Sequence, residues 1–236
     1  MKTVLITGAN KGIGFETAKQ LAQLGYFIYL GSRDKTRGLE AISKLKDAGI
    51  SNAELIELDV TDINSIKHAK QDLEAKIEAL DVLINNAGIG GELPQNISTI
   101  EIENLRKVFE TNFFGAVQTT QQFLGLLKKS NNPIIVNVSS GLGSLTVHNS
   151  RINPNYDAYS CSKTALNAFT VKLANEFINT NFKINSVSPA LPATDLNNFK
   201  GIQAVEQRAK SIVKYATLGI DGPTGGFFKE DEEIPW

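Results

Sequence analysis

The stretch from residue 3 to residue 14, Thr-Val-Leu-Ile-Thr-Gly-Ala-Asn-Lys-Gly-Ile-Gly, decides the fold of this chain. Its first half is a short apolar run, which is typical of a buried strand. Its second half carries glycines in the pattern GxxxGxG and opens a segment in which Ile13, Thr17, Leu21 and Leu24 recur at helical spacing. Glycines between a strand and a helix permit a tight turn and let the backbone approach a pyrophosphate. We predict a nucleotide-binding turn; the alternative is a glycine-rich turn without a ligand.

Short apolar runs and longer segments of helical periodicity alternate along the whole chain, as in a parallel sheet covered on both faces. The expected strands span residues 3–7, 27–31, 53–58, 82–85, 134–138, 183–187 and 226–228. The expected helices span residues 13–24, 37–48, 63–77, 100–127 and 157–179. We predict one α/β domain over residues 1–236, a doubly wound (Rossmann) parallel sheet of about seven strands with helices on both faces. Within it, residues 191–216 are predicted to form a substrate lid, of which 203–216 are amphipathic.

Charge and composition exclude several classes of partner. The 24 basic and 25 acidic residues are interspersed and give a formal charge of −1, which argues against nucleic-acid phosphates and anionic membranes. No apolar run approaches the roughly 20 residues of a membrane span, and the first apolar run is shorter than that of a signal peptide. Cys161 is the single cysteine, which suits a reducing compartment. We therefore expect a cytoplasmic protein with no metal, nucleic-acid or membrane partner.

Polar and small residues follow the second, third and fourth expected strands, where a doubly wound sheet binds its ligand. An NAD site usually has a carboxylate after the second strand, but Ser32 and Arg33 stand there, with Lys11 and Arg37 as further cations. Cations attract a ribose 2′-phosphate, so we predict NADP(H); the alternative is solvated surface charge. Asp59 is expected either to bind the adenine amino group or to stabilise a turn. In the run 85–88, Asn-Asn-Ala-Gly, the asparagine amides are expected to join neighbouring strands and the small residues to let the backbone pass close to the cofactor. The alternative is that this run is only a turn.

A candidate catalytic pair opens the helix expected at 157–179. Tyr159 and Lys163 are four residues apart and therefore share one helical face. A tyrosine pKa of about 10 is too high for efficient proton exchange, and we expect the lysine cation to lower it. A serine after the fifth strand, in the run 139–143, would orient a substrate carbonyl. Asn112 is either a satisfied buried amide or the anchor of a water that relays protons to Lys163.

Six motifs in order, from the glycine loop to the Tyr159/Lys163 pair, resemble the short-chain dehydrogenase/reductase family over roughly residues 2–196. The resemblance implies a catalytic tetrad of Asn112, Ser140, Tyr159 and Lys163, with Ser140 preferred over Ser139 because it precedes Gly143 by three. Pro189 and Thr194 would contact the nicotinamide end, although Ala190 replaces the usual glycine. The full predicted cofactor site comprises Gly8, Asn10, Lys11, Gly12, Ile13, Gly14, Ser32, Arg33, Arg37, Asp59, Val60, Asn86, Ala87, Gly88, Tyr159, Lys163, Pro189 and Thr194.

Within that family, the opening 8–14, the run 32–38 and the ending 222–228 are most similar to the NADPH-dependent carbonyl reductase group. This implies hydride transfer between NADP(H) and a carbonyl or alcohol substrate, with ketones, aldehydes or quinones reduced. The chain lacks the long insertion of the monomeric members between Ser140 and Tyr159, so we expect a homodimer or homotetramer through the helices 100–127 and 157–179. The alternatives are a non-catalytic NADP(H)-sensing protein and, less in keeping with the short C-terminal part, an epimerase or dehydratase.

Overall fold

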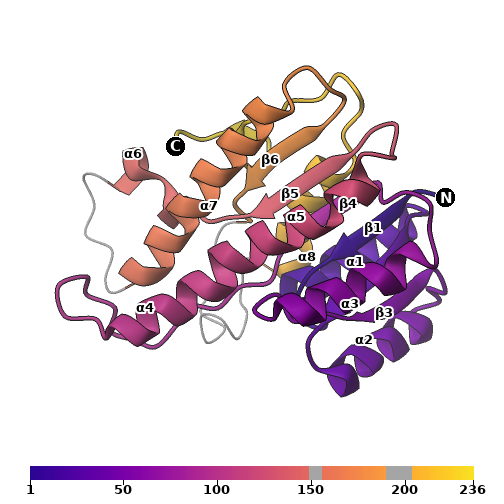
Figure 1. The fold of residues 1–236 in the computed structure, drawn as a ribbon, viewed down its shortest axis with the longest axis horizontal. Helices are drawn as coiled ribbons and strands as arrows, with labels where there is room; N and C mark the ends of the chain where they lie inside the picture. Colours follow the sequence, from indigo (N-terminus) through magenta and orange to yellow (C-terminus); the bar gives the residue numbers. More distant parts are fainter. Residues whose placement is uncertain (149–155, 190–203) are drawn as a thin grey trace.

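Strands and helices alternate along the chain and build a sheet that runs through the middle of the molecule (Figure 1). The computed structural model describes residues 1–148, 156–189 and 204–236. The strands are β1 (Thr3–Ile6), β2 (Phe27–Ser32), β3 (Ala53–Glu57), β4 (Val82–Asn85), β5 (Ile134–Val138), β6 (Lys183–Val187), β7 (Phe227–Lys229) and β8 (Glu232–Glu233). The helices are α1 (Gly12–Gln23), α2 (Lys35–Asp47), α3 (Ile63–Glu74), α4 (Ile102–Phe109), α5 (Gly115–Leu127), α6 (Leu145–His148), α7 (Asp157–Glu176) and α8 (Val205–Ala216).

The strand order is β3-β2-β1-β4-β5-β6-β7-β8, and every neighbouring pair is parallel except β7 with β8. The chain runs outward from β1 to β3 and then returns to place β4 on the other side of β1. This reversal opens a crevice at the carboxyl ends of β1 and β4, where a doubly wound sheet binds its ligand. The predicted doubly wound fold is confirmed, and the short antiparallel β8 is the strand that the sequence did not indicate.

Both faces of the sheet are buried, which explains why its strands are continuous apolar runs. Along β1, Val4 and Ile6 join the core under α1, α2 and α8, whereas Leu5 joins the core under α3, α5 and α7. The same alternation recurs in β5, where Val136 and Ile135 lie in opposite cores. Each fully buried aliphatic side chain contributes roughly 1.5–3 kcal/mol, so the two cores together hold the crevice in place.

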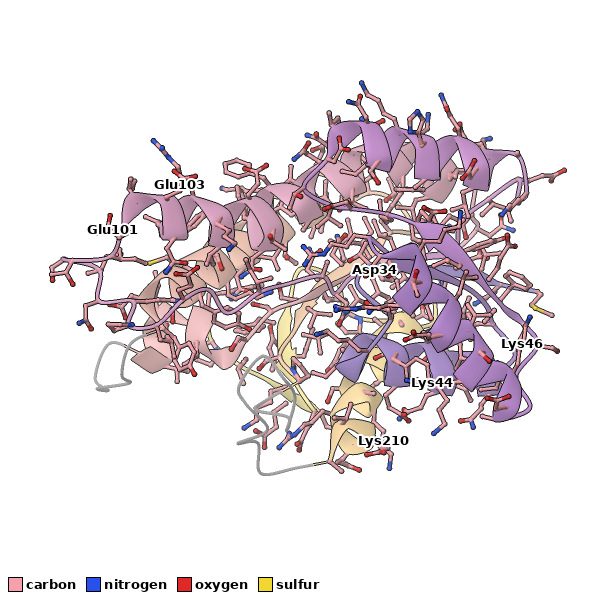
Figure 2. The ribbon with its side chains drawn as sticks, turned by 90° about the horizontal axis from the view of Figure 1, so that it is seen from below. Asp34, Lys44, Lys46, Glu101, Glu103 and Lys210 are labelled. Atoms are coloured by element: carbon pink, nitrogen blue, oxygen red, sulfur yellow. The ribbon has the colours of Figure 1, made fainter. Side chains whose placement is uncertain are left out.

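Side-chain caps set the starts of α2 and α3, through Asp34 and Asp62. Asp34 accepts a hydrogen bond from the Arg37 N–H at 3.0 Å and thereby caps α2. Lys44 and Lys46 lie in the last turn of α2, where their positive charges interact favourably with the negative end of the helix dipole. Figure 2 shows Asp34 near the middle of the molecule and the two lysines at the far end of this helix.

One expectation about helices needs correction. The helix expected at 100–127 is interrupted by a π-helical turn over Glu110–Phe114, which separates α4 from α5. This turn carries the buried Asn112, whose side chain is bonded to the loop after β4. The amphipathic segment at 203–216 contains α8, which packs on α1 and buries Ile212 in the core. The lid predicted over residues 191–216 stays a prediction, because residues 190–203 lie outside the described residues.

The molecule extends beyond the sheet on one side. Figure 1 shows α4 and the beginning of α7 reaching together past the carboxyl edge of the strands, and the two helices are in contact. Across the described ranges, no helix has both the length and the apolar character that a membrane crossing requires.

Candidate active site

The glycine loop after β1 has the backbone geometry that the sequence predicted. Gly8 and Gly12 have φ angles of +61° and +59°, in the left-handed region that favours glycine. A Cβ on Gly8 would lie 2.9 Å from the Ala87 Cα, and one on Gly14 would collide with the Asn86 amide. Among the described residues, no side chain caps the start of α1 and no acidic residue stands in its first turn. The free end of this helix dipole therefore suits an anionic group.

The loop after β4 braces the glycine loop through side-chain hydrogen bonds. The Asn86 Nδ2 donates to the carbonyls of Thr7 and Gly8, at 2.8 and 3.0 Å. The Thr7 hydroxyl in turn accepts from the N–H of Ala87 at 2.9 Å. Deeper in the sheet, the Asn85 Nδ2 donates to the Asn137 Oδ1 at 2.8 Å and joins β4 to β5. The prediction that these amides pin neighbouring strands is confirmed.

The end of β2 presents one cation that no carboxylate neutralises. Ser32 is buried and its hydroxyl donates to the Asp34 carbonyl at 2.8 Å. Arg37 lies 3.5 Å from the Asp34 carboxylate, and Lys35 pairs with Glu57 at 2.6 Å. Arg33 is exposed and makes no ion pair within the described part of the chain. It therefore keeps its full charge for a ligand.

Arg33 borders an open groove of about 1110 Å³, together with Thr61, Ile89, Thr111 and Phe114. Another hollow, of about 540 Å³, is lined by residues 74–78 and by Lys129. These residues follow α3 and α5, so they lie at the amino edge of the sheet, opposite the crevice. Of these two hollows in the described part of the chain, the groove at Arg33 adjoins the predicted site.

Asp59 forms a turn after β3. Its Oδ1 accepts from the Thr61 N–H at 2.9 Å and from the Thr61 hydroxyl at 2.7 Å. The turn interpretation is confirmed, and the contact with adenine stays a prediction. Val60 is buried against Gly115, where a Cβ would approach the valine side chain to 2.8 Å. Gly115 thus lets α5 close over this turn.

Tyr159, Lys163 and Ser140 come together at the carboxyl edge of β5. The Ser140 side chain lies beside the Tyr159 hydroxyl, close enough to lower the pKa of the phenol. The Lys163 Nζ donates to the Val138 carbonyl at 2.8 Å and lies 5.6 Å from the centre of the Tyr159 ring. Ser139 instead donates to the Asn167 Oδ1 at 2.6 Å, away from Tyr159. The geometry therefore brings Ser140, and not Ser139, to the tyrosine.

The pKa values of the pair differ from the expectation. Burial raises the pKa of Tyr159 to about 12, and the hydrogen bond from Ser140 opposes this rise only in part. Burial also lowers the pKa of Lys163 to about 8. The expected lowering of the tyrosine pKa by Lys163 is therefore wrong for this structure. The reason is that the ammonium group bonds the Val138 carbonyl, while loss of water around the phenol has the larger effect.

Asn112 is buried in the π-helical turn with its amide fully engaged. Its Nδ2 donates to the Ile89 carbonyl and to the Ser162 hydroxyl, both at 3.0 Å, and its Oδ1 accepts from the Ile89 N–H at 2.8 Å. A Cβ on Gly88 would lie 3.3 Å from the Asn112 Oδ1 and 3.6 Å from the Lys163 Nζ. Asn112 and Lys163 therefore flank the same glycine. Both N–H groups of the Asn112 amide are already engaged, with the Ile89 carbonyl and the Ser162 hydroxyl.

The serine turn is anchored at both ends. A Cβ on Gly143 would lie 2.8 Å from the Lys163 carbonyl carbon, so the turn lies directly on α7. At its other end the Ser144 hydroxyl donates to the Pro235 carbonyl at 2.7 Å, and the Thr146 N–H donates to the Trp236 carbonyl at 3.0 Å. The Trp236 ring stacks on Phe227 of β7. No pattern in the sequence predicts this contact.

Two buried side chains beside Tyr159 were also missed. Gln95 accepts from the Tyr159 N–H at 3.1 Å, and Ser162 donates to the Tyr159 carbonyl at 2.7 Å. Gln95 lies outside the six motifs, and Ser162 occupies an unassigned position between Tyr159 and Lys163. What marks both is a polar side chain with no exposed surface, which the sequence does not reveal. Pro189 is buried directly after β6, and Thr194 lies outside the described residues.

The chain matches the family model described as short chain dehydrogenase over residues 2–204. It is a member of the short-chain dehydrogenase family. The (+)-neomenthol dehydrogenase of Capsicum annuum is 33% identical, over 97% of this chain and 95% of the relative. The salutaridine reductase of Papaver bracteatum is 32% identical, over 97% of this chain and 94% of the relative. Because such relatives are dehydrogenases and reductases, this short-chain dehydrogenase is an oxidoreductase.

Solved structures agree with this assignment. The NADPH-bound carbonyl reductase from chicken fatty liver superimposes with a TM-score of 0.88 at 26% identity, over 100% of this chain and 99% of that one. The salutaridine reductase of Papaver somniferum gives 0.87 at 28% identity, over 97% and 99%. The alignment with the Capsicum protein runs over 301 positions against 236 residues here, so that relative carries insertions that this short-chain dehydrogenase lacks.

Proposed function

We propose that this short-chain dehydrogenase transfers a hydride between NADP(H) and a carbonyl or alcohol substrate, with Tyr159 as the general acid or base. The observation that carries the proposal is the placement of Ser140 beside the Tyr159 hydroxyl, with Lys163 one helical turn away and the glycine loop in the same crevice. If these side chains served only to stabilise the fold, the site would not need the uncapped start of α1 and the exposed Arg33 nearby. These two features therefore favour a cofactor-binding active site.

The residues of the crevice fit a phosphorylated dinucleotide. The positive φ angles of the glycine loop and the uncapped start of α1 suit a pyrophosphate, and Arg33 suits the 2′-phosphate. The other proposed contacts are those predicted from the sequence, from Lys11 in the loop to Thr194. When bound, the nicotinamide supplies or accepts the hydride.

The side chains at the carboxyl edge of β5 handle the proton. Because the pKa of Tyr159 is about 12, its hydroxyl holds its proton at neutral pH, and transfer to the carbonyl oxygen depends on the negative charge that this oxygen gains as the hydride arrives. Ser140 orients that oxygen and hydrogen-bonds the phenolate that remains, and the Lys163 ammonium would bind the nicotinamide ribose. Asn112 fixes the loop at Ile89 and, in this proposal, anchors the water that restores the proton. Within the described residues, no group of His, Cys, Asp or Glu side chains is arranged to hold a metal ion.

The test is Tyr159→Phe, with consumption of NADPH followed at its absorbance band. The panel holds ketones, aldehydes and quinones, including menthone, isopiperitenone and salutaridine, after which relatives are named. We expect kcat to fall by about 100- to 10,000-fold, because a positioned proton donor contributes 10²–10⁴-fold to the rate. The Kd for NADPH should change by less than about threefold, and Tyr26→Phe should behave as wild type.

Near-wild-type turnover in Tyr159→Phe would exclude the mechanism. Tight NADPH binding without turnover of any compound in the wild-type protein would favour a cofactor sensor instead. We also propose a cytoplasmic location, supported by the single cysteine, and a homodimer through the side of the molecule that carries α4 and α7. Cell fractionation tests the first of these.

A further inference from the structure

Two side chains form hydrogen bonds with the backbone of Tyr159, one with its N–H and one with its carbonyl. Its N–H donates to the Gln95 Oε1 at 3.1 Å, and its carbonyl accepts from the Ser162 hydroxyl at 2.7 Å. Tyr159 stands in the first turn of α7, where backbone N–H groups have no partner within the helix. Gln95 therefore caps the turn that carries Tyr159, from 64 residues away in the sequence.

The same two side chains lead back to the loop after β4. The Gln95 Nε2 donates to the Gly90 carbonyl, and the Ser162 hydroxyl accepts from the Asn112 Nδ2 at 3.0 Å. Asn112 is bonded to both the N–H and the carbonyl of Ile89. Since Ile89 and Gly90 are neighbours in the chain, the bonds form a closed ring. Its members are Gln95, Tyr159, Ser162, Asn112, Ile89 and Gly90.

The ring is shielded from water and has little room to move. Gln95 and Ser162 have no exposed surface, and Asn112 is 1% exposed. A Cβ on Gly91 would lie 2.7 Å from the Gln95 Nε2, and the backbone of Gln95 also pairs with Tyr156. Buried polar groups cost about 1–3 kcal/mol each when left unpaired, so the ring favours one arrangement of the three segments it joins.

We propose that Gln95 and Ser162 are positioning residues for Tyr159, which fix the tyrosine relative to the loop at Gly88–Gly90. That loop contacts Lys163 and Asn112, so the ring sets the distance between the proton donor and the cofactor edge of the crevice. The proposal rests on the proposed function. Neither residue touches the reacting atoms; each acts through the Tyr159 backbone.

The experiment compares Gln95→Leu, which removes both bonds of Gln95, with Gln95→Glu, which retains the Oε1 acceptor. The matched control is Gln121→Leu, because Gln121 is exposed on α5. Three readouts are measured for each protein: kcat, the Kd for NADPH, and hydrogen exchange of the Tyr159 amide by NMR. Ser162→Ala removes the opposite side of the ring and replaces Gln95→Leu if that variant does not fold.

We expect Gln95→Leu to lower kcat by about 10- to 100-fold, since displacement of a reacting group by about 1 Å can cost 100-fold. The Kd for NADPH should stay within about threefold, and the Tyr159 amide should exchange at least about tenfold faster. Gln95→Glu should retain more of kcat than Gln95→Leu, and Gln121→Leu should match wild type.

A kcat within twofold of wild type in Gln95→Leu overturns the positioning role, as does a loss of NADPH affinity in parallel with kcat. Amide exchange separates this proposal from the proposed function. If wild-type protein turned over no substrate, the proposed function would fail, and the exchange rate would still decide whether the ring holds Tyr159. Unchanged exchange in Gln95→Leu overturns the ring itself.

Discussion

At the scale of single residues, Lys163 places a buried positive charge in the crevice, and its lowered pKa makes stability depend on pH. The folded protein releases this proton near pH 8, whereas the unfolded chain keeps it to about 10.5. Between those values the unfolded state binds more protons, so the free energy of unfolding rises with pH. Below pH 8 Lys163 is charged in both the folded and the unfolded state, so the free-energy cost of burying its charge is fully present.

We therefore expect wild type to gain about 2 kcal/mol of stability between pH 7 and pH 9.5, relative to Lys163→Met. Urea unfolding of both proteins at the two pH values measures this difference, and the subtraction removes the other titrating groups. Lys163→Met should be inactive at both values. An equal response of the two proteins to pH would mean that the lysine pKa is not lowered.

Arg33 is the residue on which cofactor choice depends. Its charge is unpaired within the described residues, whereas Lys35 is bound to Glu57. Arg33→Ala should reduce the NADPH/NADH ratio of kcat/KM by about 10- to 100-fold, because a charge-assisted bond to phosphate contributes roughly 1.5–3 kcal/mol. Lys35→Ala should leave the ratio within about twofold. An unchanged ratio in Arg33→Ala would remove the basis of the NADP(H) assignment.

At the scale of secondary-structure elements, the serine turn and α7 touch through Gly143. A methyl group there would meet the backbone of Lys163 and Thr164, at 2.8 to 3.0 Å, and backbone cannot yield as a side chain can. We expect Gly143→Ala to cost about 1–3 kcal/mol of stability and to lower kcat, because Ser140 would move away from Tyr159.

Gly125 provides the matched control for this prediction. It stands inside α5 with open space around its Cα, so Gly125→Ala should stabilise the protein by about 0.5–1 kcal/mol through helix propensity. Thermal unfolding and steady-state kinetics of both variants give the comparison. If Gly143→Ala were as stable and active as wild type, the close contact between the turn and α7 would not be needed.

The elements differ in how well the sequence predicted them. Strands with two buried faces were recognisable because every residue of β1 or β5 is apolar, or is a small polar residue in a known motif. The π-helical turn was not, since no local pattern marks it and the bonds that Asn112 makes from this turn reach Ile89, 23 residues away. Gln95 was missed for the same reason: its contacts lie in the tertiary structure, and no local pattern encodes them.

At the scale of the whole molecule, the side that carries α4 and α7 exposes apolar surface. Ile97, Ile102 and Phe114 are 57%, 57% and 46% exposed. Figure 2 shows Glu101 and Glu103 at the far end of this side, beyond the sheet. Apolar groups with a charged rim are typical of a subunit interface.

We predict that light scattering gives at least twice the 25.7 kDa of one chain. Phe114→Glu should shift the mass to that of a single chain, since it places a charge in the apolar surface. Leu39→Glu is the control, because Leu39 is 53% exposed on α2, at the other end of the molecule. A monomeric wild-type protein would contradict the predicted homodimer.

The contact of Trp236 with the serine turn has a practical consequence for work with this enzyme. Ser144 and Thr146 bond the carbonyls of Pro235 and Trp236, only a few residues from Ser140. An affinity tag or reporter fused after residue 236 would emerge beside the crevice and compete for those bonds. A fusion before Met1, at the opposite end of the molecule in Figure 1, leaves the catalytic side untouched and is the better choice for purification and for immobilisation on a surface.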